Sequence, residues 1–590
     1  MAVLICAMPA AASWRTRFLS PSEGGGAAAV AVDGGGDVVA AGGRLSPTDA
    51  GAVAKYDGAD GAEVWHRLLS GTNPDSNYLE DVALESNGDA VVVGTFTNVG
   101  TNTDLAVVKL AAADGAEIWR TVVHSGYDNG TAVAVDAGGD VVAGGGFWIG
   151  NTTRDVVVLK LAVATGVETW RWVLSAAPND TNHVFDVAVD GAGDVIAVGT
   201  FQNALGAVKL DGTTGAQIWR ASLDAYSEPT AVVLGGTGDV FVPAFLSVGT
   251  AGDDFGVLRL SGTTGAELWR YSTRGEGWAF AVNGARSLAL DAAGDVVAGG
   301  EIVNHATYQD IAVVKLAGAT GSEVWRTVIS GSTDPYSYEQ AASVAVDGAG
   351  DVVAGVALGN RRSEPPAVLK LSGSTGAERW RQVSGGTEVT LFAGGDIAAA
   401  GSSHVMRVSG LDGGIGTVAG RTLQVRDRTG DTTAELLVGL AVDPAISMPP
   451  PGSAGDPALG GATVRLVNPL TLESATLAIP GGAGWTAIGN PPGSKGWRYR
   501  DLTGAGGPCK SALARPGKLK ALCQGTQGPI PFSLDEPSQG TLVFSLQLGS
   551  AAPQCATFGG TIRRDQGAGA PGETGYFLAA EAPPAPGGCP

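Results

Sequence analysis

Aromatic residues beside Asn and Asp recur in stretches of the chain that differ from one another in length and composition. SGTNPDSNY ends at Tyr78, and SGYDN contains Tyr127. Aromatic rings next to amide and carboxylate groups can stack on a sugar and bind its hydroxyls, or contact a protein partner. Ordinary turns use the same Asn, Asp, Ser and Gly, so a purely structural role stays open. The candidate ligand-binding residues are Tyr78, Tyr127, Trp148, His183, Tyr226, Trp278, Tyr308 and Tyr336.

The aspartates and histidines that could bind a metal ion do not recur at the sequence spacings typical of metal sites. Asp104, Asp155, Asp254 and Asp310 each lie five residues before a Lys or Arg, where their oxygens could bind calcium or cap the start of a strand. The histidines, His66, His124, His183, His305 and His404, are scattered along the chain. No nucleophile–base pair can be argued from spacing. We therefore expect strand caps at the aspartates, and neither a metal site nor catalytic residues.

The elements that must position these residues form an internal repeat. The string KLAAADGAEIWR ends at Trp119-Arg120, and its Gly115 lies four residues before the Trp. A spacing of about 50 residues between such strings is typical of repeat architectures. The repeated tryptophans are Trp14, Trp65, Trp119, Trp170, Trp219, Trp269, Trp325 and Trp380.

Each repeat contains four strand-like runs, of the types VAVD, GDVV, VVKL and the Trp run. Several runs are apolar at every position, which is typical of strands covered on both faces. Sheets stacked around an axis satisfy this pattern, so the repeat predicts an all-β, eight-bladed β-propeller over residues 13–412. The chain begins with a Trp run and ends the repeat with a KL-like run, so we expect the N-terminal strand to complete the last blade.

Symmetric folding of the hairpin around DGADG places Lys55 opposite Glu63 and Val53 opposite Trp65. We expect a cross-strand ion pair there and in the equivalent hairpins. In this architecture the second-to-third and blade-to-blade connections share one face of the disc. Because they vary in length and chemistry, we expect the binding site on that face.

The two ends of the chain differ from the repeat. Residues 1–12, MAVLICAMPAAA, are typical of a signal-peptide remnant, with a plain N-terminal strand as the alternative. Residues 413–590 predict a β-rich, sandwich-like region of one or two modules. Its cysteines, Cys509, Cys523, Cys555 and Cys589, lack CxxC spacing and predict two disulfides; three pairings are open, and proximity favours Cys509–Cys523 with Cys555–Cys589.

A net charge of −21 argues against nucleic acid or an anionic membrane as a partner. The sequence has no run of about 18 apolar residues, so we expect no membrane-spanning helix.

The pattern KLxxxTGxEVWR resembles the tryptophan-docking repeat of PQQ-like propellers, and VAVDGAGDVVAGG followed by VVKL resembles the SBBP-type bacterial propeller repeat. The resemblance covers about residues 13–412 and implies a propeller of a secreted or envelope protein. Quinoprotein enzymes of this superfamily use a vicinal Cys pair with PQQ and calcium, and residues 13–412 contain no Cys. We therefore expect no cofactor and a non-enzymatic scaffold, secreted or on the cell-envelope exterior, that binds a protein or glycan. A quinoprotein-like oxidoreductase or a glycan-cleaving enzyme on the same scaffold is the alternative.

Overall fold

The fold is that of a computed structural model of the 590-residue chain, which divides into two compact units. Unit 1 comprises residues 1–378 and 384–410, and unit 2 comprises residues 379–383 and 411–590. The structure describes residues 14–582 without 19–25, 45–48, 74–75, 150–152, 176–181, 248–251, 276–280, 305–307, 331–338, 358–366, 384–387, 392–396, 401–403, 409–415, 418, 429–430, 432, 434, 444–445, 447, 454, 469–473, 502, 504–505, 531, 533, 535–537, 550–553, 560 and 568–573. The expected signal remnant, residues 1–12, lies outside these.

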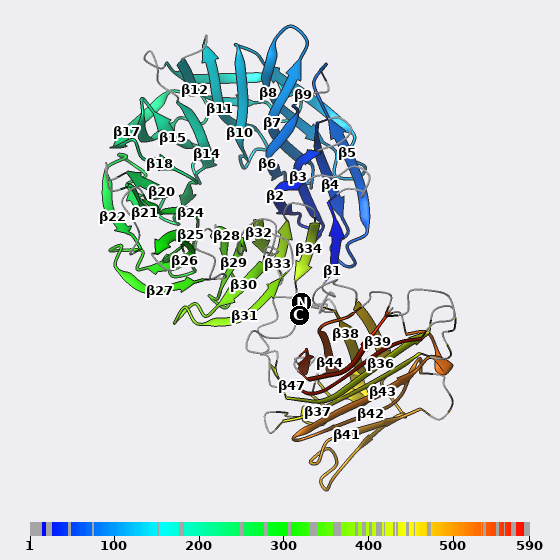
Figure 1. The fold of residues 1–590 in the computed structure, drawn as a ribbon. Helices are drawn as coiled ribbons and strands as arrows, with labels where there is room; N and C mark the ends of the chain where they lie inside the picture. The colour runs from blue at the N-terminus through cyan, green and yellow to red at the C-terminus, as the bar shows by residue number, and fades with distance from the viewer. Residues whose placement is uncertain are drawn as a thin grey trace, which may run out of the picture. The chain divides into compact units, whose positions relative to one another are not determined.

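The strands of residues 14–408 form sheets in which chain neighbours mostly pair antiparallel, with one short parallel pairing of β21 with β23. These sheets surround a central axis (Figure 1). Within the described residues there are eight such sheets. The first seven are β2(Gly26–Val32) to β5(Glu63–Leu69) through β3(Val38–Arg44) and β4(Ala50–Tyr56); β6(Tyr78–Leu84), β7(Ala90–Asn98), β8(Asn102–Leu110) and β9(Glu117–Val123); β10(Tyr127–Val135), β11(Val141–Ile149), β12(Thr153–Leu161) and β13(Glu168–Leu174); β14(His183–Val189), β15(Val195–Phe201), β16(Ala204–Leu210) and β17(Gln217–Ala225); β18(Glu228–Pro229), β19(Val233–Leu234), β20(Val240–Ser247), β21(Gly252–Leu260), β22(Glu267–Thr273) and β23(Ala281–Val282); β24(Gly284–Leu290), β25(Val296–Asn304), β26(Tyr308–Leu316) and β27(Glu323–Ile329); β28(Gln340–Val346), β29(Val352–Ala357), β30(Ala367–Leu371) and β31(Glu378–Val383).

The remaining sheet joins the two ends of this region. It has the order β1(Trp14–Arg17), β34(His404–Val408), β33(Ile397–Ala400) and β32(Glu388–Leu391). Trp14 pairs with Arg407 and Arg17 with His404, so the N-terminal strand completes the last sheet as predicted. This pairing covers an edge that would otherwise be exposed.

The recurring tryptophan links each sheet to the next. The Trp119 indole nitrogen donates a hydrogen bond to the Val163 carbonyl, 2.9 Å away in the following sheet. The ring lies on Gly166, where an added Cβ would be 2.5 Å from a Trp119 ring carbon. Gly166 also has a φ of +66°, which favours glycine, and these two constraints explain the Gly of the repeat. The bond recurs from Trp65, Trp170, Trp219, Trp269 and Trp325.

The predicted Lys55–Glu63 pair is wrong. Lys55 lies opposite Trp65, because a β-bulge leaves Val64 unpaired in the ladder and shifts the register. Glu63 contacts His66 of its own strand instead, with 2.6 Å between carboxylate and imidazole. The equivalent glutamates bind the Arg three residues later, in Glu117–Arg120, Glu168–Arg171, Glu267–Arg270 and Glu323–Arg326.

The lysine of the repeat pairs with the acids of the first hairpin. Lys55 Nζ lies 2.8 Å from Asp33 and 3.2 Å from Asp37. Where Gly235 replaces the first acid, the cation is Arg259, which contacts Asp239 through two nitrogens. The other pairs are Lys109–Glu85, Lys160–Asp136, Lys209–Asp190, Lys315–Asp291 and Lys370–Asp347.

Unit 2 consists of two sheets that share one hydrophobic core. Cys509 and Cys523 are cross-strand neighbours and form the predicted disulfide. Cys555 is also disulfide-bonded, whereas Cys589 lies outside the described residues. The larger sheet contains β40(Trp485–Ala487), β41(Trp497–Arg500), β42(Cys509–Arg515), β43(Lys518–Gln524), β37(Leu436–Val442), β36(Gly420–Arg428), β47(Thr574–Ala582) and β46(Thr561–Gln566), and the smaller β35(Gly416–Thr417), β45(Gln554–Phe558), β44(Leu542–Leu548), β38(Ala462–Val467) and β39(Ser474–Ile479); α1(Pro457–Gly460) and a 3₁₀ turn, Gly525–Gln527, complete the unit.

No helix among the described residues is long and apolar enough to span a membrane.

Candidate functional site

A pocket of about 610 Å³ opens where the β6–β9 sheet meets the β10–β13 sheet. It contains three of the predicted ligand-binding residues, Tyr78, Tyr127 and Trp148. The full lining is Tyr78, Thr95, Thr103, Tyr127, Asp128, Asn129, Trp148 and Arg154. The site therefore combines aromatic rings with amide, hydroxyl, carboxylate and guanidinium groups.

The strand order brings these side chains to one edge of the sheet. Tyr127 begins β10 and pairs with Trp148 near the end of β11, and Trp148 pairs with Arg154 near the start of β12. Successive antiparallel strands return to the same edge, so residues distant in sequence meet there. This is the edge with the second-to-third and sheet-to-sheet connections, where the sequence predicts the site.

Arg154 lies along the wall of the pocket. Its guanidinium is 5.8 Å from the centroid of the Trp148 ring and donates to the side chain of Asn129. Gly146 makes room for it, because a Cβ there would be 2.3 Å from Arg154 Nε. Burial lowers the pKa of Arg154 to about 10, and attraction from Tyr78 and Asp128 opposes that shift. Arg154 remains a cation at neutral pH, and its buried Nε is an unused donor.

Two buried oxygens beside the pocket have no hydrogen-bond partner. They are Asp128 Oδ1 and Thr95 Oγ1, on side chains of residues that are each only 1% exposed. A buried polar atom without a partner is unfavourable and therefore points to a bound ligand, ion or water.

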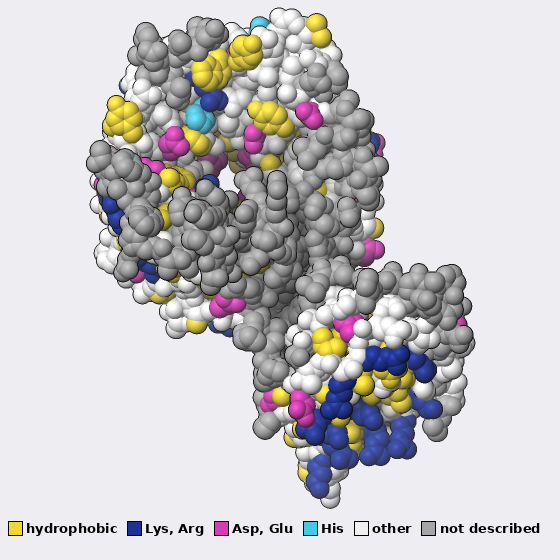
Figure 2. Space-filling view, in the orientation of Figure 1, with side chains coloured by type: hydrophobic (Ala, Val, Ile, Leu, Met, Phe, Trp, Pro, Cys, Tyr) yellow, Lys and Arg dark blue, Asp and Glu magenta, His cyan; other side chains and the backbone are white. Residues whose placement is uncertain are grey.

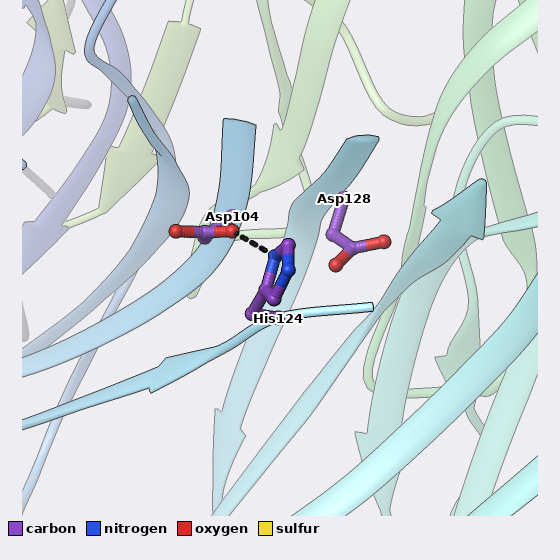
Figure 3. Close-up of side chains that lie close together, drawn as sticks. All are labelled: Asp104, His124 and Asp128. Atoms are coloured by element: carbon purple, nitrogen blue, oxygen red, sulfur yellow. Dashed lines mark hydrogen bonds and ion pairs between the residues drawn. The ribbon is translucent and has the colours of Figure 1, made fainter. Parts of the chain in front are cut away.

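Asp128 also belongs to a second group, with Asp104 and His124 (Figure 3). Nδ1 of His124 lies 2.8 Å from Asp104 Oδ1, and one ligand atom from each of the three residues lies within 4.8 Å of the others. Burial raises the pKa of Asp128, while hydrogen bonds from the Ser125 and Gly126 amides oppose the rise. The sequence spacing did not predict this cluster, because the three side chains meet only through strand pairing and sheet stacking.

The other predicted binding residues do not line this pocket. His183 begins β14, pairs with Thr200 and packs its ring 4.1 Å from that of Phe185. Tyr226 is 79% exposed. Tyr308 begins β26, and its main chain pairs with Asn304 at the end of β25. Trp278 and Tyr336 lie outside the described residues.

Three carboxylates interact across the innermost strands of unit 1. Burial, together with the charge of Asp81, raises the pKa of Glu388 to about 7; burial and Asp81 do the same to Asp186. Asp81 and Asp186 also accept main-chain amides of the following sheet, from Val133 and Val232. Quinoprotein enzymes hold PQQ against a vicinal Cys pair. Residues 13–412 contain no Cys, so the carboxylates at the innermost strands do not fit PQQ bound in that way.

The ring of sheets linked by docked tryptophans defines a β-propeller of the PQQ-like repeat type. Residues 6–208 and 154–355 match the family described as outer membrane protein assembly factor BamB, and the chain belongs to that family. Similar solved structures include BamB from Moraxella catarrhalis, 14% identical over 62% of this chain and 92% of that one with a TM-score of 0.37. Quinohemoprotein alcohol dehydrogenase from Comamonas testosteroni is 12% identical over 68% and 76%, with a TM-score of 0.47. A europium-containing methanol dehydrogenase is 12% identical over 66% and 85%, with a TM-score of 0.44. No curated protein matches the sequence.

Proposed function

We propose that the chain is a non-enzymatic, eight-bladed propeller of the cell envelope or exterior that binds a glycan through the pocket at Tyr127 and Trp148. The propeller would span residues 13–412, with residues 413–590 as a separate β-sandwich-like region. The observation that carries the proposal is the meeting of three aromatic residues with Arg154 and Asn129 in one cavity. Aromatic faces suit sugar rings, and planar polar side chains suit ring hydroxyls or a sugar carboxylate.

Glycan-array binding of the full chain tests this proposal. We expect binding to anionic glycans that falls at least tenfold in Trp148→Ala and Tyr127→Ala. Tyr226→Ala is the matched control, because it removes an exposed aromatic that does not line the pocket. Equal binding by all three variants would overturn the choice of pocket.

A protein partner is the second candidate, because the family is described as an assembly factor. A photoreactive amino acid at position 127 distinguishes the two. Crosslinking in envelope extract to one protein, together with no glycan binding, would favour a protein ligand.

The catalytic alternative is a quinoprotein-like oxidoreductase or a glycan-cleaving enzyme. The absence of Cys from residues 13–412 argues against the first. An absorption spectrum with a quinone band and stoichiometric calcium in the purified protein, or turnover of an array glycan, would overturn the non-enzymatic proposal.

A further inference from the structure

Asp128 occupies a position that holds Asn in other repeats. Asn77 and Asn283 each lie three residues before the unpaired residue of a β-bulge, as Asp128 does. Asn77 accepts the Thr97 amide at 2.9 Å and donates its side-chain NH₂ to the Asp49 carbonyl at 3.1 Å. Asn283 makes the same two kinds of bond, to Val303 and Asp253. A carboxylate cannot donate as this amide does, and Asp128 Oδ1 is the oxygen without a partner.

His124 also differs from the residue at the equivalent position of another repeat. Like Asp128, it lies where the β6–β9 sheet meets the β10–β13 sheet. Asp104 and Asp310 hold equivalent positions in their sheets. Each directly precedes the residue that pairs with the last residue of the fourth strand, β9 or β27. Asp310 Oδ1 accepts a hydrogen bond from Ser330 at 2.8 Å, and His124 takes the place of that serine beside Asp104. A serine hydroxyl only completes the hydrogen bonding of the acid, whereas a neutral imidazole is also a metal ligand.

We propose that Asp104, His124 and Asp128 bind one divalent transition-metal ion of the Zn²⁺ or Mn²⁺ class. One imidazole nitrogen and two carboxylate oxygens suit such ions, and the nitrogen disfavours calcium. The ion would be the missing partner of Asp128 Oδ1 and would neutralise two carboxylates on residues that are 1% exposed. The His124 side chain is 45% exposed, which leaves an open side for entry and for water ligands.

The repeat provides variants that should fold. Asp128→Asn installs the residue of Asn77 and Asn283, and His124→Ser installs that of Ser330. His66→Ser is the control, because His66 also contacts a carboxylate but lies outside the cluster.

After chelator treatment and dialysis, the full chain is titrated calorimetrically with ZnCl₂, MnCl₂ or CaCl₂. We expect one equivalent of Zn²⁺ or Mn²⁺ for the wild type and His66→Ser, and at least a tenfold weaker affinity for the two cluster variants. Absence of stoichiometric binding, a preference for Ca²⁺, or unchanged binding by Asp128→Asn would overturn the site. No glycan is needed, so this test fails or succeeds independently of the proposed function.

A different observation concerns unit 2, where Lys and Arg gather on one face around hydrophobic side chains (Figure 2). The exposed residues Arg498, Arg500, Lys518 and Lys520 alternate with buried ones on β41 and β43. Cross-strand pairing places Lys520 between Leu513 and Leu440, both half-buried. The outward positions of β41, β42, β43 and β37 hold Lys, Arg, Leu, Val, Ser and Gln, and no acid.

The charge of the chain is divided unequally between its parts. Residues 411–590 contain 13 Lys and Arg and 13 Asp and Glu, so the net charge of −21 resides in residues 1–410. The expectation that an anionic membrane is no partner rested on the whole-chain average and does not apply to this face.

We infer that the basic sheet face of unit 2, defined by Arg498, Arg500, Lys510, Lys518 and Lys520, docks on a phosphate-bearing lipid surface. Charge complementarity favours an anionic occupant. The leucines among the cations favour a lipid over nucleic acid, because nucleic acid offers phosphates without an apolar layer.

Cosedimentation with vesicles tests this second inference. We expect binding to phosphatidylglycerol–phosphatidylcholine vesicles and not to phosphatidylcholine alone, with about a tenfold loss for Lys520→Glu. Arg220→Glu, an equal charge change on an exposed residue of β17, should bind as wild type. Equal loss in both variants, no vesicle binding, or tighter binding to duplex DNA than to the vesicles would overturn it.

Discussion

The indole nitrogen of Trp219 donates a hydrogen bond to the carbonyl of Gly262, 3.0 Å away in the next sheet and 43 residues along the chain. Both atoms are buried, and five other described tryptophans make the same bond. The docked indole is therefore the repeated connection between neighbouring sheets.

Trp219→Phe should destabilise the protein by about 1–3 kcal/mol, because a smaller aromatic ring replaces the indole and the Gly262 carbonyl loses its donor. Denaturant unfolding measures the change. Trp172→Phe, on a half-buried ring 6.2 Å from that of Phe201, is the comparison. An equal loss in both variants would mean that the hydrogen bond adds nothing beyond ring packing.

Gly115→Ala should destabilise by about 1–3 kcal/mol. Gly115 has a φ of +67°, and a Cβ would lie 2.6 Å from a ring carbon of Trp65. Gly34→Ala, where a Cβ meets nothing within 4 Å, should change the free energy of unfolding by less than about 1 kcal/mol. A neutral Gly115→Ala would contradict the close approach of ring and main chain.

Lys370→Met should destabilise by about 3–5 kcal/mol. The side chains of Lys370 and Asp347 are each 2% exposed with 2.7 Å between their charged atoms, and the substitution leaves Asp347 and Asp351 without this cation. Lys370→Arg should retain most of the stability, since Arg259 fills the same role elsewhere. If the arginine variant were as unstable as the methionine variant, packing rather than charge would explain the loss.

The free energy of unfolding should fall as pH rises from about 4 to about 7 through the contribution of Asp186. Burial and Asp81 raise the folded-state pKa of Asp186 from 3.8 to about 7. The folded state thus holds a proton that the unfolded state releases, and deprotonation in this window favours unfolding. Partial exposure of Asp186 should make the fall smaller than the shift alone implies.

Asp186→Ser is the matched variant for this pH dependence, because Ser287 accepts the Val344 amide at the equivalent position. Urea unfolding across the window should show a flatter profile for the variant. Parallel profiles would show that Asp186 does not titrate there.

The sheet order could be predicted because most strands of residues 14–408 pair with a chain neighbour, and the Trp strings mark the fourth strand of each repeat. The ring closure could be predicted because the repeat begins with a Trp run and ends without one, so that β1 pairs with β34. The register of the hairpin between the third and fourth strands, such as β4 and β5, could not be predicted. Folding the turn symmetrically ignores the bulge at Val64, which moves Trp65 opposite Lys55 and directs Lys55 to Asp33. The bulge lies next to Trp65, whose ring packs on Gly115 of the next sheet, and the sequence of one hairpin does not show that contact.

For the site, the sequence predicted that Tyr127 and Trp148 share one face of the propeller, because it assigned both to the variable connections. Their cross-strand pairing appears only in the structure. Arg154 and Thr95 were not predicted, because both lie within strands, β12 and β7, and neither is aromatic. Aligning the repeats position by position could have singled out Asp128, which stands where Asn77 and Asn283 stand, and Arg154, where Thr103 stands.

Ligand binding at the pocket is tested most directly by a crystal structure of the full chain with the glycan that binds most strongly on the array. We expect a sugar ring against Tyr127 and Trp148 with its polar groups toward Arg154 and Asn129. A sugar bound elsewhere, for example beside Asp81 and Asp186 at the innermost strands, with the pocket filled only by water, would contradict it.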